Sequence, residues 1–259
     1  MMTAHQLKQI AHDSLSLSES PLLKHYKRGR FRVWNGVAMT GSELPGPGFN
    51  FAACLGDVPP FAELWPIATE FFADAKDGWG ILVEGDAGHP MEAELKQQRW
   101  TIAEDEPAFV LESWTPVTPS VEGLAIRKAE SEVDRDAYLT ITMKAFGAPP
   151  ELAKLFVPSL SFVQDPEIAM FIGTVAGEDV AAVGYNVAGT TAVISGTATL
   201  EDHRGKGYGA ALIQLALNDA RLKGCTTASL RSGPLSIPLY ERLGFRYVCQ
   251  HRTYAKAPG

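Results

Sequence analysis

The sequence contains little cysteine, and this scarcity argues against covalent cross-links and metal sites. It has three cysteines in 259 residues, Cys54, Cys225 and Cys249. Their number is odd, they lie far apart, and none belongs to a CxxC pair or to a Cys/His ligand spacing. We therefore expect neither disulfides nor structural zinc, and no other metal ion is indicated.

Long basic blocks are also absent, and the formal net charge of the chain is -7. Binding to a phosphate backbone needs clustered lysine and arginine, so nucleic acid and an anionic membrane are not expected as partners. The first residues lack the basic start, apolar stretch and small-residue cleavage site of a signal peptide. We expect a cytoplasmic protein, and whether it forms a homodimer stays open.

One uncharged stretch, Val180 to Leu200, has the length of roughly 20 residues that a membrane-spanning helix needs. It contains Asn186, several threonines and a break at Gly189, with β-branched residues on both sides of the break. That pattern predicts two strands joined by a turn and not a spanning helix.

The composition is that of a soluble globular protein, with 46% hydrophobic and 20% charged residues. The length exceeds the usual 100 to 200 residues of one domain, which leaves one large domain or two small ones. The segment TPVTPS at Thr115 to Ser120 carries two prolines and is the best candidate for a linker. We accordingly predict two domains, residues 1–118 and 122–257.

Hydrophobic periodicity and turn residues predict alternating helices and strands. In the first half we expect helices up to about Lys27, at Phe61 to Ala75 and at Met91 to Gln98, and strands at Phe31 to Met39, Trp79 to Val83 and Ala108 to Glu112. In the second half we expect helices at Asp134 to Phe146 and Gly207 to Lys223, a short one before Gly244, and strands at Leu124 to Arg127, Met170 to Val175, Val180 to Asn186, Thr191 to Leu200, Thr226 to Leu230 and Tyr247 to Thr253. This order predicts an α/β fold with a mixed sheet.

The segment Thr197 to Leu212, TATLEDHRGKGYGAAL, has the pattern of a phosphate-binding turn. A predicted strand leads into three glycines and then directly into a helix. Glycines let the backbone approach an anion closely, and the first N–H groups of the helix point toward it. Arg204 and Lys206 add positive charge in an acidic chain.

Other interpretations of these glycines are possible. A purely structural turn would use the same residues. Gly205, Gly207 and Ala210 also satisfy the loose dinucleotide pattern, which would make the chain a nicotinamide oxidoreductase. Leu230 and Arg231 stand where that pattern needs an acidic residue, and too little chain follows for the further βα units of such a sheet. No P-loop pattern is present, so triphosphate hydrolysis is not supported.

Tyr240 lies in a short predicted helix, in the run PLYERLGFRY before the last strand. We expect Ser236 to cap this helix. Side chains on a helix lean toward its N-terminus, which would direct the phenol back toward the end of the sheet that carries the glycine turn. A phenol with a pKa near 10 can protonate a leaving thiolate. A core tyrosine with one satisfied hydroxyl is the alternative interpretation.

Together, ATLEDHRGKGYGAALI and LYERLGFRY resemble the GNAT superfamily of N-acyltransferases. Arg204, Gly207 and Gly209 match the family's R/Q-x-x-G-x-G/A pyrophosphate motif, and the resemblance covers about Leu124 to Lys256. It implies a GNAT-like fold and acetyl-CoA as cosubstrate. The chain departs from the family at Gly233, where asparagine is frequent, and at Glu201, where proline is frequent.

The resemblance also assigns site residues. It implies that the backbone of three strand residues pairs with the pantetheine arm, that the following turn binds the pyrophosphate, and that Tyr240 is the general acid. The strand residues are Ala198, Thr199 and Leu200, and the turn residues are Arg204, Gly205, Lys206, Gly207, Tyr208, Gly209 and Ala210. No general base is evident. Glu201 is a candidate, although a solvated loop position is its more ordinary role, and the same holds for His203.

The first half contains a weaker version of the same pattern. WGILV, MEAELKQQ and RWTI parallel TASL, PLYERL and GFRY, with Leu95 in place of Tyr240 and no glycine turn. We hypothesise a degenerate GNAT-like N-terminal domain that contributes packing or shapes the substrate site.

The function predicted from the sequence is transfer of an acetyl group from acetyl-CoA to a primary amine of a small molecule or peptide by direct attack. A covalent route is disfavoured because no Cys or Ser lies beside a base in the matched motifs. The alternative is a non-catalytic sensor or interaction module that binds acyl-CoA without turnover.

Overall fold

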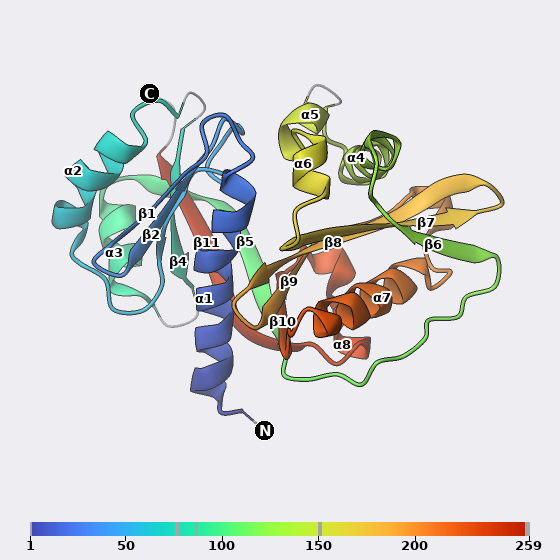
Figure 1. Ribbon diagram of the computed structural model, residues 1–259. Coiled ribbons are helices and arrows are strands. Elements are labelled where there is room, and N and C mark those ends of the chain that lie inside the picture. Colours follow the sequence, from blue (N-terminus) through green and yellow to red (C-terminus); the bar gives the residue numbers. More distant parts are fainter. Residues whose placement is uncertain (1, 76–77, 86–87, 150–151, 257–259) are drawn as a thin grey trace.

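The computed structural model describes residues 2–75, 78–85, 88–149 and 152–256. Residues 1 and 257, the outer ends of the two predicted domains, lie outside this part. The described strands form one sheet of 11 strands in the order β1-β2-β3-β4-β11-β5-β10-β9-β8-β7-β6 (Figure 1). Their bounds are β1 Arg30–Trp34, β2 Val37–Gly41, β3 Phe51–Cys54, β4 Gly80–Glu84, β5 Trp100–Leu111, β6 Leu124–Lys128, β7 Ile168–Val175, β8 Glu178–Ala188, β9 Thr191–Thr199, β10 Thr227–Arg231 and β11 Arg246–Lys256.

The helices cover both faces of this sheet. They are α1 Ala4–Leu23, α2 Phe61–Phe71, α3 Pro90–Gln97, α4 Glu132–Phe146, α5 Ala153–Phe156, α6 Leu160–Val163, α7 Tyr208–Leu222 and α8 Ile237–Arg242. In Figure 1, α4, α5 and α6 lie above the strands of the second half and α7 and α8 lie below them, while α1 runs along the junction of the two halves. The mixed α/β fold expected from the sequence is confirmed.

The two halves share one succession of elements, and each completes its sheet with a strand of the other half. The parallel pair β3 and β4 is connected through α2, and the parallel pair β9 and β10 through α7. A short helix and a last strand follow in both halves. These last strands are exchanged, because β5 pairs with β10, β11 pairs with β4, and β5 and β11 pair with each other, all antiparallel.

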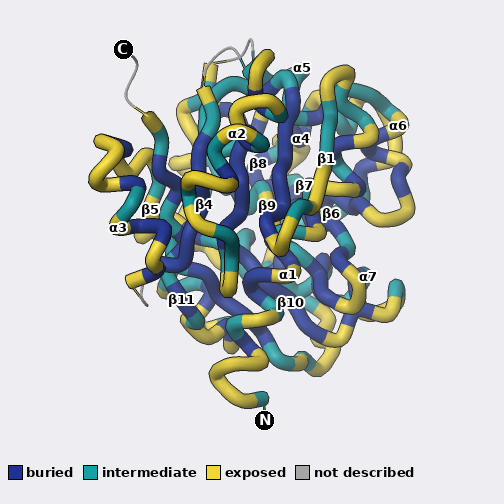
Figure 2. The backbone as a smooth tube through the Cα atoms, turned by 90° about the vertical axis from the view of Figure 1, so that its left-hand side faces the viewer, coloured by how far each residue is buried: buried dark blue, intermediate teal, exposed yellow. Residues whose placement is uncertain are grey.

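Successive side chains of β8 point to opposite faces of the sheet, and their contacts define these two faces in the second half of the chain. Ala181 and Val183 pack in one core cluster with Leu212 and Ala216 of α7, on what we call the α7 face. Ala182 packs in a different cluster with residues of α4, on what we call the α4 face. Strands β2, β3 and β4 and most of β7 and β8 are buried, while β5 and β11 in the middle of the sheet are partly exposed (Figure 2).

Several sequence expectations need correction. The strand expected at Phe31 to Met39 is a hairpin, since Asn35 and Gly36 take positive φ values of 44° and 81° between β1 and β2. Asn-Gly is the strongest sequence signal for such a two-residue turn. Strand β3 and helices α5 and α6 were not predicted. The predicted linker at Thr115 to Ser120 has no helix or strand.

None of the helices within the described residues is both long and apolar enough to cross a membrane. The uncharged stretch from Val180 to Leu200 forms most of β8 and β9, as its threonines and central break predicted.

Candidate active site

Strands β9 and β10 diverge in the middle of the sheet. They pair as parallel neighbours only from Thr191 to Val193 on β9 and from Thr227 to Ser229 on β10. Strand β9 then continues to Thr199 without a β10 partner. The divergence leaves part of the β9 edge able to hydrogen-bond with an extended ligand.

A bulge in β9 lies within this diverging part. The register with β8 shifts between Ala182 and Gly184, opposite Gly196, whose φ is +57°. An added Cβ at Gly196 would lie 1.9 Å from the hydroxyl oxygen of Tyr138 on α4, so only glycine fits this close approach. The bulge also changes which β9 side chains face α7.

The chain from β9 to α7 forms the predicted glycine turn. Gly205 and Gly207 have φ values of +77° and +85°, and α7 begins at Tyr208. Among the described residues, no acceptor binds the backbone N–H groups of residues 205 to 210, while the N–H of Ala211 bonds to Gly207. These unpaired amides at the positive end of a 15-residue helix form an anion-binding arrangement.

Both predicted cations lie at the turn. Arg204 Nε donates to the carbonyl oxygen of Thr199 at 3.1 Å, and Lys206 Nζ donates to that of Asp202 at 3.0 Å. Both residues are exposed, and neither forms an ion pair with an acidic residue in the described part of the chain. Their charges therefore remain available to an anion.

The three predicted strand residues differ in what their backbones can do. The N–H of Leu200 bonds to Val180 on β8, and Ala198 is in register with Ala182 on the same strand. Because alternate residues of a strand direct their backbone groups to opposite sides, those of Thr199 point away from β8 toward the gap. Thr197 has the same parity as Thr199, so Thr197 and Thr199 offer the gap-facing backbone.

Tyr240 lies beneath this gap on the α7 face. It is 5% exposed and packs against the rings of Phe109 and Phe245. An added Cβ at Gly209 would lie 3.6 Å from Leu239 and 3.7 Å from Thr199 Oγ1, which places α8 against the glycine turn and the end of β9.

The environment keeps the Tyr240 phenol protonated. Burial raises its pKa, and the nearby Thr197 side chain acts in the opposite direction by favouring the phenolate. The buried Thr197 hydroxyl has no partner at ordinary hydrogen-bond distance among the described residues. A neutral phenol beside the gap can donate a proton to a developing anion.

The helix that carries Tyr240 differs from the prediction at its start. Ser236 makes no side-chain cap hydrogen bond with α8, so its predicted capping role is wrong.

Two cavities lie beside the diverging strands. Their volumes are about 270 Å³ and 490 Å³, and Glu19, Asn186, Ser195 and Gly196 line both. Glu19 comes from α1, far away in the sequence, and no local motif marks it. Burial raises the pKa of its carboxyl group, and Arg231 opposes this shift. A half-buried carboxyl group with a raised pKa at a cavity is a candidate general base.

The two base candidates from the sequence lie elsewhere. Glu201 is exposed in a short 3-10 turn, and His203 lies 3.7 Å from the carboxylate of Glu178. Neither lines the two cavities.

Three buried side chains outside the motif have the chemistry of metal ligands. Cys249 Sγ lies 3.8 Å from His12 Nε2 and 3.4 Å from His251 Nε2, and His12 Nε2 lies 3.4 Å from Glu84. Tetrahedral zinc would hold sulfur and nitrogen ligands about 3.5 Å apart. However, Glu84 already pairs with Lys8 at 2.6 Å, and His251 Nδ1 has no acceptor in the described part of the chain, where a ligating histidine ordinarily has one. The spacing rule missed this cluster because His12 is distant in the sequence.

Comparison with known proteins finds a family match over the part of the chain that contains the diverging strands and the glycine turn. The acetyltransferase (GNAT) family model matches residues 128–245. Among curated proteins, none matches the sequence. The solved structure of a GCN5-related N-acetyltransferase from Kribbella flavida has a TM-score of 0.72 at 20% identity, covering 95% of this chain and 96% of that one. A GCN5-related N-acetyltransferase from Sphaerobacter thermophilus has a TM-score of 0.60 at 16% identity, covering 98% and 93%.

A tandem GNAT protein from the clavulanic acid biosynthesis pathway has a TM-score of 0.58 at 13% identity, covering 89% of this chain and 80% of that one. At these identities the structural likeness establishes the fold alone. The family match adds the general chemistry of acyl transfer for the segment that contains the diverging strands and the glycine turn. Residues 128–245 therefore form an acetyltransferase domain of the GNAT family.

Proposed function

We propose that the protein is an acyl-CoA-dependent N-acyltransferase that moves an acetyl group from acetyl-CoA to a primary amine. The observation that carries this proposal is the row of unpaired amides at residues 205 to 210, next to the gap-facing edge of β9. Backbone amides and cations of this kind bind a pyrophosphate, and an unpaired strand edge can hydrogen-bond with the amide groups of a pantetheine arm.

The residues divide the binding of acetyl-CoA between them. Residues 204 to 210 hold the pyrophosphate through backbone N–H groups and the charges of Arg204 and Lys206. The backbones of Thr197 and Thr199 pair with the pantetheine arm. The thioester then lies in the gap between β9 and β10, above Tyr240.

The chemical step is direct transfer. The amine nitrogen attacks the thioester carbonyl carbon, a C–N bond forms and the C–S bond breaks. Tyr240 donates its phenolic proton to the departing thiolate, and the proton lost by the amine goes to a base on the opposite side of β9. Because its pKa is raised by burial, Tyr240 stays protonated until the thiolate forms.

The N-terminal residues 1–118 are proposed to form a degenerate GNAT-like domain that shapes the substrate site of the 122–257 domain. Supporting this, β3, α2, β4, α3 and β5 repeat the order of β9, α7, β10, α8 and β11. Leu95 on α3 is fully buried and takes the place of Tyr240. Pro60 precedes α2, and the stretch before that helix lacks the paired glycines of the anion site.

A titration with acetyl-CoA tests the binding site. The double variant Arg204→Ala, Lys206→Ala should weaken acetyl-CoA binding by roughly 100-fold or more, since each charged contact contributes about 1.5 kcal/mol or more. Lys144→Ala, an exposed cation on α4, is the matched control and should bind as the wild type does. Equal affinity in all three proteins would refute the site.

Turnover separates the proposal from its alternative, a non-catalytic acyl-CoA sensor. The assay is release of free CoA thiol in the presence of a broad panel of primary amines. Release that depends on the amine supports the transferase. Tight acetyl-CoA binding with no release for any amine supports the sensor.

A further inference from the structure

The larger cavity, of about 490 Å³, is built by both halves of the chain. Its walls include Leu22 near the end of α1 and Tyr26 in the turn after it, Leu44 and Phe49 in the loop before β3, and Tyr138 and Phe146 on α4. Its volume lies in the range of about 300 to 1,000 Å³ that small-molecule sites occupy. The N-terminal half therefore supplies one wall of a cavity that opens beside the bulge of β9.

The lining of this cavity is mostly apolar. Aromatic and aliphatic side chains dominate, and Glu19 is the one charged residue among the described residues that line it. A single acidic group in an apolar cavity selects a cation with an apolar body, because a polar body would lose its hydration without compensation.

Glu19 occupies the junction of the two cavities, near Ser195 and Gly196. It lies on the α4 face, because α1 contacts that face through Asn186, whose side chain donates to the carbonyl oxygen of Ser18 at 2.7 Å. Tyr240 lies on the α7 face. A proton acceptor and a proton donor thus lie on opposite sides of the gap between β9 and β10.

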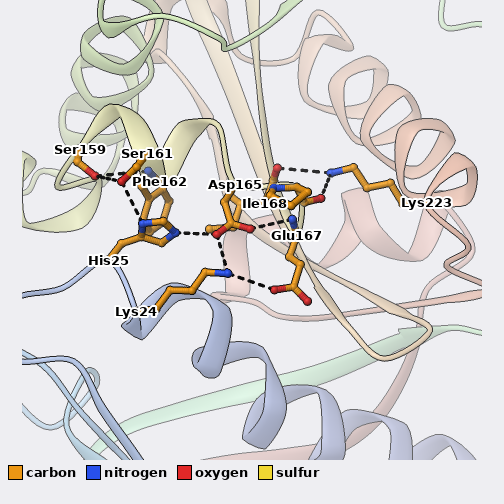
Figure 3. Close-up of polar contacts among 10 residues, drawn as sticks. Lys24, His25, Ser159, Ser161, Phe162, Asp165, Glu167, Ile168 and Lys223 are labelled. Carbon is orange, nitrogen blue, oxygen red and sulfur yellow. Dashed lines mark hydrogen bonds and ion pairs between the residues drawn. The ribbon is translucent and has the colours of Figure 1, made fainter.

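The helix that carries Glu19 is fixed in place at its C-terminal end. Figure 3 shows Lys24 and His25 both directed toward Asp165, at 2.8 Å and 2.7 Å. Earlier on α1, the hydroxyl groups of Ser14 and Ser229 hydrogen-bond at 2.6 Å, which ties the helix to β10. These contacts hold the cavity wall in position before any ligand binds, which lowers the cost of ordering.

We propose that this cavity is the acceptor site and that it takes a primary amine with an aryl or alkyl body, with Glu19 as the group that binds the ammonium and removes its proton. This inference rests on the proposed acyl transfer. One proton passes from the ammonium to the Glu19 carboxylate, and the neutral amine then attacks the thioester carbon. The C–S bond breaks, and Tyr240 protonates the thiolate. As the amide forms, its nitrogen loses a second proton, which passes through water to the tyrosinate. The products are then the amide, CoA thiol, protonated Glu19 and neutral Tyr240, and Glu19 returns its proton to water.

A substrate panel tests the class of amine. Phenethylamine and hexylamine are compared with ethanolamine and putrescine in the CoA-release assay. The amines with a phenyl or alkyl body that fills the cavity should have a kcat/KM about 10-fold or more above that of the polar amines, because each methylene group buried in an apolar pocket improves discrimination by about that factor. Equal or better turnover of the polar amines would overturn the inference while leaving acyl transfer intact.

Glu19→Gln tests the base, with Asp13→Asn on the exposed side of α1 as the matched control. Glu19→Gln should lower kcat/KM for phenethylamine by about 100-fold or more, and the loss should shrink as the pH rises and more amine is neutral. The acetyl-CoA affinity and circular dichroism spectrum should stay unchanged. A Glu19→Gln protein as active as Asp13→Asn would refute the role of Glu19.

Calorimetry separates failure of this inference from failure of the proposed function. Phenethylamine should bind the wild-type protein without acetyl-CoA and bind Glu19→Gln at least about 10-fold more weakly, the worth of one charged contact. If amine binding is seen without CoA release, the transferase proposal fails and the amine site stands. If CoA is released but the wild type and Glu19→Gln bind phenethylamine equally well, the proposed amine site fails and acyl transfer stands.

Discussion

Replacing Gly196 by alanine tests the bulge that shapes the candidate active site. The backbone at this position has a φ of +57°, which costs a residue with a side chain about 1 to 2 kcal/mol. The new Cβ would lie 1.9 Å from the Tyr138 hydroxyl oxygen and 3.1 Å from the carbon that bears it. Relieving this collision adds about 1 to 3 kcal/mol of overpacking.

The expected total loss is therefore about 2 to 5 kcal/mol in the free energy of unfolding. In a chain of this size it lowers the melting temperature by roughly 5 to 15 °C. Differential scanning calorimetry measures the effect. The variant Tyr138→Phe removes the colliding oxygen, so the double variant Gly196→Ala, Tyr138→Phe should lose only about the 1 to 2 kcal/mol of the backbone conformation.

A double-mutant cycle over these two positions should thus give a favourable coupling of about 1 to 3 kcal/mol. A Gly196→Ala protein that melts with the wild type would show that β9 has no bulge of this geometry. A full loss of stability that Tyr138→Phe does not reduce would show that α4 does not press on the bulge.

Four further predictions follow from other parts of the structure. Tyr240→Phe should lower CoA release by about 100-fold or more with little effect on acetyl-CoA affinity, and unchanged turnover at every pH would remove Tyr240 from the mechanism. Burial favours protonation of Asp165, but hydrogen bonds from Lys24, the amide of Glu167 and His25 outweigh it and hold its pKa below the ordinary value. The stabilisation by the Asp165 carboxylate is therefore present above about pH 4 and is lost as the pH falls through the lowered pKa. Asp165→Asn should lower the free energy of unfolding at pH 7 by about 1 to 3 kcal/mol, and this difference from the wild type should disappear in acid. A chelator should leave the melting temperature unchanged, because Glu84 is already paired with Lys8, and a drop that zinc restores would contradict this. The fragment 122–257 should fail to fold alone, because β11 would lose both neighbours, and a cooperative melting transition in that fragment would be the contrary result.

The parts of the fold and site that sequence reasoning predicted are local ones. The run from β9 through α7 to β10 was predicted closely because its strand, glycine turn and helix signals are contiguous. The positive φ of Gly205 and Gly207 agrees with their expected role in the turn. The alternating and helical patterns also located α2, α3 and α4 to within a few residues, since each buries one face against the sheet.

The parts that were missed depend on distant segments. Glu19 has no motif around it, and only the packing of α1 across β8 and β10 brings it to the cavities. The exchange of β5 and β11 involves pairing partners more than 100 residues apart, which hydrophobic period does not specify. Strand β3 has only four residues, all buried, and so shows no alternation to recognise.

The exchange of last strands gives a physical reason why the first half persists without an anion site of its own. Strand β11 lies between β4 and β5, so the second half closes its sheet only with strands of the first. The same arrangement holds the first half, and α1 with it, at a fixed position beside the gap between β9 and β10. A carboxylate on α1 can then serve a reaction in the second half as precisely as a residue of that half, because no hinge separates them. The first half needs no anion site for this role, because its strands and α1 alone supply the pairing and the position.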